Sequence, residues 1–185
     1  MLDASNHTGM DQRNVEELIK KMRDDELDIL VATFYKESQV GRSVSSSKKG
    51  GKDIDSHVFK SKLRESVEKL RNLADEGALR NADIRAEIKR LSEETGVSIG
   101  QSQKVINVYL KFYCLLLKKP IELLSELDCP LDSITMQGRD KMKNVETMEQ
   151  YESYQKQFEK DYGIRILKDE DYDSNRIKES FKLKD

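Results

Sequence analysis

Four polar side chains gather on one face of the most apolar segment of the chain, and they are the best placed to do chemistry. Gln103, Asn107 and Lys111 recur at i, i+4 spacing, and Lys104 lies beside them. Long amide and ammonium side chains in this pattern can hydrogen-bond a ligand or a phosphate group. Apolar walls and the charge of Lys111 would favour the neutral, nucleophilic form of the Lys104 amine.

The segment 98–117, which carries these side chains, has the pattern of one long helix. Ser98 and Gln101 have the spacing of a capping box, which predicts where the helix begins. On a helical wheel the apolar side chains cover about 220° and leave a polar stripe of about 100°. The helix is therefore expected to be buried over most of its circumference. The polar stripe is interpreted either as its solvent-facing side or as the lining of a cleft.

Helical periodicity also predicts the elements around this central helix. Val15, Leu18 and Met22 begin a pattern that runs from 13 to 38, as one helix or two abutting ones. Caps and breakers predict further helices at 55–75, from Asn81 to Gly96, from Pro120 to Leu127, from Asp132 to about Lys143, and from Thr147 to Gly163. The predicted fold class is all-α: a compact orthogonal multi-helix bundle around the central buried helix, with a polar C-terminal helix and tail.

The distribution of apolar residues predicts one helical domain over 12–163. Residues 1–11 are expected to be a disordered lead, and 164–185 a charged tail that is partly ordered. Between them, 40–55 is expected to contain a flexible basic loop, because glycine and serine are frequent there. Its positive charges come from Arg42, Lys48, Lys49 and Lys52. The loop is either a solvated segment or a mobile arm that binds phosphate.

Composition narrows the compartment and the partners. The chain has 33 Lys and Arg against 35 Asp and Glu, and this balance argues against coating of nucleic acid by a uniformly basic surface. Cys114 and Cys129 lie in apolar surroundings, and no secretory or membrane-spanning segment is predicted, so a reduced pair in the cytoplasm is expected. His7 and His57 are too far apart to indicate a metal site, and no cofactor motif is found.

Two short motifs, within about 95–137, resemble the helix-hairpin-helix DNA glycosylases, in particular the archaeal 8-oxoguanine glycosylase type. Thr95 to Val105 places Gly96 and Gly100 before and at the start of the long helix, with Lys104 one turn later. After that helix, Cys129-Pro130-Leu131-Asp132-Ser133 resembles the family's Pro-aliphatic-Asp-Ser/Thr pattern. The family's hairpin is usually a compact Gly-x-Gly, whereas three residues separate the two glycines here.

The resemblance implies a catalytic site in which Lys104 is the nucleophile and Asp132 is its carboxylate partner. In that family the hairpin amides hold a DNA phosphate, which would assign Gly96 and Gly100 to the hairpin. The lysine forms a Schiff base with the sugar, and the carboxylate stabilises the developing positive charge. Asp132 as a plain helix cap is the alternative interpretation of that residue.

The sequence therefore supports two principal hypotheses. The first is a glycosylase-like DNA-binding protein that excises bases by a lysine Schiff-base mechanism. It predicts that Lys104 and Asp132 face each other across a cleft. The second is a non-catalytic helical binding or inhibitor module that acts on a protein partner or on a phosphorylated nucleotide, and it includes a homo-oligomer. Neither hypothesis involves a membrane.

Overall fold

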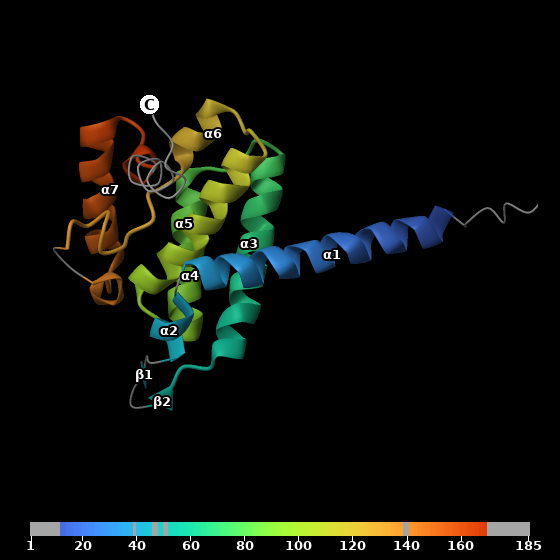
Figure 1. Cartoon of the computed structure of the whole chain (residues 1–185), viewed down its shortest axis with the longest axis horizontal. Helices are drawn as coiled ribbons and strands as arrows, with labels where there is room; N and C mark the ends of the chain where they lie inside the picture. The colour runs from blue at the N-terminus through green and yellow to red at the C-terminus, as the bar shows by residue number, and fades with distance from the viewer. Residues whose placement is uncertain (1–11, 39, 46–47, 50–51, 139–140, 170–185) are drawn as a thin grey trace, which may run out of the picture.

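The computed structural model describes residues 12–38, 40–45, 48–49, 52–138 and 141–169 (Figure 1). The chain follows the order α1 Gln12–Glu37, α2 Val40–Ser45, β1 Lys48–Lys49, β2 Lys52–Asp53, α3 Ser56–Asp75, α4 Asn81–Thr95, α5 Ile99–Leu116, α6 Ile121–Glu126, η1 Met142–Asn144 and α7 Met148–Tyr162. The two short strands pair with each other in antiparallel orientation. The all-α prediction is therefore confirmed.

Helix α5 is the centre of the bundle, as its apolar pattern predicts. It contacts α1, α2, α3, α4, α6, η1 and α7, and most of its side chains are buried. The expected capping box is present, because Ser98 accepts from the Gln101 amide and the Gln101 side chain accepts from the Ser98 amide. This reciprocal cap satisfies amides that the first turn of a helix leaves without internal partners.

Helices α3 and α4 pack on α5 and on each other. Their buried side chains recur with helical spacing, as in Phe59, Leu63 and Leu70 of α3 and Ile84 and Ile88 of α4. Each such side chain removes apolar area from water, which is the main favourable contribution to folding. The helix boundaries predicted for this part of the chain agree with the structure to within a residue or two.

Helix α1 is a single helix with two differently placed halves. Its C-terminal half buries Leu27, Val31 and Phe34 against the bundle. Arg64 and Arg71 of α3 form ion pairs with acidic side chains of α1. Its N-terminal half extends beyond the rest of the bundle into solvent (Figure 1). The sequence predicts a compact bundle, and the N-terminal half of α1 is the part of the described chain that departs from this prediction.

Two predicted segments differ from the structure. The expected flexible loop begins instead as α2, because Val40 and Val44 lie four residues apart and both enter the core. The expected helix from Asp132 to about Lys143 is replaced by a turn at 133–138, and the described chain resumes shortly before η1. The predicted disordered lead at 1–11 and most of the predicted tail, 170–185, lie outside the described residues.

Candidate functional site

The structure brings Lys104 and Asp132 together as a direct ion pair. The Lys104 ammonium donates to Asp132 Oδ2 at 2.7 Å. The two side chains are 12% and 27% exposed, so the pair lies at the edge of the buried interior. Helix α5 positions the lysine, and the segment after α6 positions the carboxylate. The two groups are in direct contact, whereas the glycosylase hypothesis predicts that they face each other across a cleft.

The Asp132 carboxylate is also a backbone cap. Its Oδ1 accepts hydrogen bonds from the amides of Ile134 and Thr135, each at 2.9 Å. Burial opposes its ionisation, but Lys104 and these two amides outweigh burial and hold the pKa of Asp132 below its ordinary value. The capped segment makes a single turn and ends at Gly138, whose φ of 68° is left-handed.

Both glycines of the predicted hairpin have internal structural roles. Gly96 ends α4 in the left-handed conformation, with φ 79°, and its amide donates to Ser92. The Gly100 amide donates to the Val145 carbonyl at 2.8 Å. A Cβ at Gly100 would overlap the Met142 carbonyl oxygen, so this position requires glycine for close backbone contact. The Gly100 amide, which the resemblance places in the phosphate-binding hairpin, is thus bound by the protein itself.

Gln103 joins α5 to the segment that carries Asp132. Its Oε1 accepts from the Leu131 amide at 3.0 Å, and its Nε2 donates to the Leu131 carbonyl at 3.0 Å. Gln155 of α7 makes the same pair of bonds to Cys129, at 2.9 and 2.8 Å. The two glutamines and the two residues that they bind are all buried. The segment 129–131, which has no regular secondary structure, is therefore held by two side-chain amides that satisfy its backbone groups.

Asn107 continues this network toward a buried carboxylate. Its Nδ2 donates to Gln103 Oε1 and to the Tyr151 hydroxyl, at 3.0 and 2.8 Å. Tyr151 in turn donates to Asp128, which is 1% exposed and also binds two arginines. Those arginines are Arg85 of α4 and Arg165, which follows α7. The carboxylate is thus compensated by two charges and a hydroxyl, as a buried charge requires.

Lys111, the last member of the polar stripe, is 2% exposed and pairs with Asp169 at 2.9 Å. Gln103 and Asn107 are equally buried. The interpretation of these three residues as a solvent-facing side is therefore wrong, because the 128–131 segment, α7 and the residues after it cover them. Gln103, Lys111 and the Nδ2 of Asn107 bind the protein itself, whereas Asn107 Oδ1 is buried without a hydrogen-bond partner among the described residues.

The basic positions of the predicted loop fall in α2 and in the short hairpin. Arg42 lies on α2, Lys48 and Lys49 form β1, and Lys52 lies in β2 opposite Lys49. The side chains of these four residues lie outside the part that the structure describes, so phosphate binding by them stays a prediction. Among the described residues, no group of three or more His, Cys, Asp and Glu side chains is arranged to hold a metal ion.

A groove of about 250 Å³ lies beside the turn that Asp132 caps. Its lining includes Thr135 and Met136 of the turn, Tyr154 and Phe158 of α7, and Lys168. Neither Lys104 nor Asp132 lines it. A glycosylase needs a pocket in which the extruded base meets the nucleophile, and this groove does not provide that meeting.

Sequence reasoning missed the partners that complete the network: Asp128, Tyr151, Gln155, Arg165 and Asp169. One signal was present, because Tyr151 and Gln155 recur at i, i+4 and define a face of α7. That spacing identifies a common face but not what the face contacts. Arg165 and Asp169 lie after the end of α7, where helical periodicity does not predict which way a side chain points.

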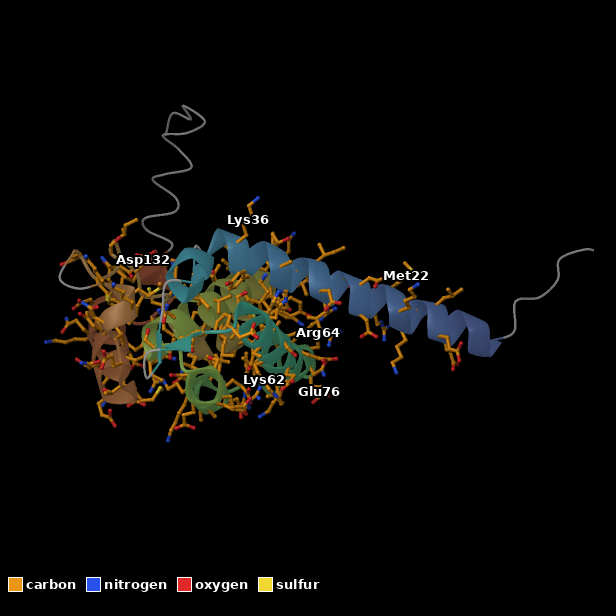
Figure 2. The ribbon with its side chains drawn as sticks, turned by 90° about the horizontal axis from the view of Figure 1, so that it is seen from below. Met22, Lys36, Lys62, Arg64, Glu76 and Asp132 are labelled. Atoms are coloured by element: carbon orange, nitrogen blue, oxygen red, sulfur yellow. The ribbon has the colours of Figure 1, made fainter. Side chains whose placement is uncertain are left out.

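A second candidate surface lies on α1, on the side turned away from the bundle. We define the outer α1 face as Leu18, Ile19, Met22 and Ile29, which are 49%, 44%, 70% and 66% exposed. Figure 2 shows Met22 on the projecting helix, far from Asp132 at the other end of the bundle. Large apolar side chains gathered on one exposed face are typical of an interaction surface.

Comparisons with protein-family models, with curated proteins and with solved structures found no match to this chain. The site must therefore be interpreted from its own geometry. In the described part of the chain, no helix combines the length and the apolar character needed to cross a membrane.

Proposed function

We propose that this protein is a non-catalytic helical binding module that acts on a protein partner. The observation that carries the proposal is the contrast between its two candidate surfaces. The polar side chains suited to chemistry are bound to other groups of the protein inside the bundle. The outer α1 face, in contrast, leaves large apolar side chains in water.

The interior network is poorly suited to binding a ligand. A ligand that displaced Leu131 or Tyr151 from Gln103 and Asn107 would have to replace several buried hydrogen bonds at once. Leaving one such group unpaired costs about 1–3 kcal/mol. The network instead fixes the position of the 128–131 segment and of α7, which is a scaffold role.

The outer α1 face is suited to binding a protein. It is apolar, it lies on a regular helix, and it spans residues 18 to 29, about three turns. An amphipathic helix that presents side chains at these spacings is a recurring mode of protein recognition. The proposal therefore assigns binding to α1 and support to the rest of the bundle.

A photo-crosslinking amino acid at Met22 tests this proposal in the full chain. The matched control carries the same photoprobe at Lys20, which is exposed on the opposite side of the same projecting half. After irradiation in an extract of the source organism, we expect a discrete cross-linked protein with the Met22 probe alone. The same species must disappear when Leu18→Glu is added. Equal labelling at both positions would overturn the proposal.

A glycosylase-like enzyme is the second candidate, favoured by the 2.7 Å contact between Lys104 and Asp132. The resemblance to helix-hairpin-helix glycosylases supports it through the same two residues. Against it stand two contacts: the Gly100 amide already donates to the Val145 carbonyl, and Lys104 Nζ is already bound to the Asp132 carboxylate.

Borohydride trapping distinguishes this second candidate. Duplex DNA with an 8-oxoguanine or an abasic site is incubated with the wild type, with Lys104→Gln and with Lys89→Gln, which removes an exposed lysine of α4. A covalent adduct that is lost only with Lys104→Gln would establish the enzyme and displace the binding-module proposal. Absence of any adduct would remove the enzyme.

A further inference from the structure

We propose that the outer α1 face binds a second copy of this chain and that the two α1 helices pair in antiparallel orientation. This inference rests on the proposed function, because it names the partner of the same surface. It is carried by the geometry of α1, by the position of its charges, and by the way in which the helix projects from the bundle.

The outer α1 face and the inner face of the same helix point in different directions. On a helical wheel the mean direction of Leu18, Ile19, Met22 and Ile29 lies about 150° from that of Leu27, Val31 and Phe34. The inner face is buried against the bundle. The chain's own core therefore uses one side of α1 and leaves the other side for a separate contact.

The outer face extends along both halves of α1. Leu18, Ile19 and Met22 lie on the projecting half, whereas Ile29 lies where α3 already binds the helix through Arg64. The projecting half reaches beyond the bundle (Figures 1 and 2). A partner that covers all four side chains must therefore be elongated and must follow the helix axis.

A second α1 helix in antiparallel orientation meets this requirement. When Leu18 is level with Ile29 of the second copy, the projecting half of each helix covers the bundle-bound half of the other. The two-fold symmetry then buries the four side chains of each copy in one seam. The bundles lie at opposite ends of the pair, where they do not obstruct it.

The charges beside the outer face favour this orientation. Lys21 and Asp28 lie on the same flank of α1 and are exposed. In the antiparallel register, each Lys21 lies within one turn of Asp28 of the second copy, with opposite charge. Asp28 is 60% exposed even while it pairs with Arg64, so it can accept a second cation.

A parallel pair in register is disfavoured by Asp25. This side chain borders the outer α1 face, between Met22 and Ile29. In a parallel pair, Asp25 of each copy would lie at the same level of the seam, and like charges at such positions repel. In the antiparallel register, Asp25 lies level with Met22 of the second copy.

Sedimentation equilibrium of the full chain tests the association. We expect a reversible dimer, and we expect Met22→Glu to raise its dissociation constant by about tenfold or more, because a buried methionine is replaced by a charge in both copies. Lys20→Glu, on the opposite side of the projecting half, is the matched control and should leave the constant unchanged. A monomer at all concentrations would overturn the inference.

Disulfide trapping tests the orientation. Under mild oxidation, the Leu18→Cys/Ile29→Cys variant should form a covalent dimer, whereas each single variant should not. The native Cys114 and Cys129 are buried, so wild-type protein under the same oxidation is the background. Dimer formation by Leu18→Cys alone would indicate another orientation or register and would overturn the inference.

These outcomes separate the inference from the proposed function. A monomeric protein whose Met22 photoprobe labels a different protein would remove the second copy as partner and would keep the binding module. A protein that neither self-associates nor cross-links at Met22 would remove both.

Discussion

Gln103 of α5 binds Leu131 and Gln155 of α7 binds Cys129, each through the same pair of amide hydrogen bonds to the backbone. Pro130 lies between the two bonded residues and has no N–H to satisfy. Each glutamine therefore supplies what a neighbouring strand would supply. This arrangement holds the segment that carries Asp132 in contact with Lys104.

Gln103→Leu should destabilise the fold by about 2–4 kcal/mol, because the N–H and C=O of Leu131 would be buried without partners. Urea unfolding followed by circular dichroism measures the change. The control is Gln157→Leu, which replaces an exposed glutamine of α7 and should change stability by about 0.5 kcal/mol or less. Equal effects of the two substitutions would contradict the role given to Gln103.

Gly100→Ala should destabilise the protein by about 2 kcal/mol or more, because the new Cβ would overlap the Met142 carbonyl. The direction of the stability change is informative, because a glycine-to-alanine substitution in an unobstructed helix stabilises the protein by about 0.5–1 kcal/mol. Thermal unfolding measures the change through the melting temperature. A raised melting temperature would show that the α5 start and the 142–145 segment are not in close contact.

Lys104 and Asp132 should be energetically coupled by about 1 kcal/mol in a double-mutant cycle, the range of a partly exposed ion pair. The variants Lys104→Met, Asp132→Asn and their combination supply the cycle, with urea unfolding as the measurement. Additive effects would indicate that the contact contributes no stability.

The stability contribution of Asp132 should depend on pH. Its pKa is lower in the folded protein than the ordinary value of about 3.9, so the unfolded chain binds the proton more readily. The contribution is therefore fully present above pH 5 and is lost as pH falls through the folded pKa. The difference in free energy of unfolding between the wild type and Asp132→Asn should become smaller as the pH is lowered from 7 to 2.5. A difference that does not change with pH would contradict the shift.

Both cysteines should be unreactive in the folded protein. Burial raises the pKa of Cys114 to about 11 and raises the pKa of Cys129 well above its ordinary value, so neither forms the thiolate that reacts. Ellman's reagent at pH 8 should label neither thiol rapidly under native conditions and both in urea. Rapid native labelling would show that one of them is accessible.

Local patterns in the sequence were sufficient to predict most helices. The apolar spacing at Phe59 and Leu63, the capping box at Ser98 and the left-handed glycine at Gly96 act within one or two turns of chain. Their physical causes are local sterics, amide capping and burial of one helical face. The same reasoning identified α5 as the central buried helix.

Only the tertiary structure decided which groups the polar side chains of α5 contact. A wheel can place Gln103 and Lys111 on one stripe, but their partners are 28 and 58 residues away in sequence. Whether a stripe faces water, a ligand or a buried carboxylate depends on which segment covers it. The outer α1 face shows the converse, because periodicity identified Leu18 and Met22 as apolar positions of a helix and only the packing of the bundle left them exposed.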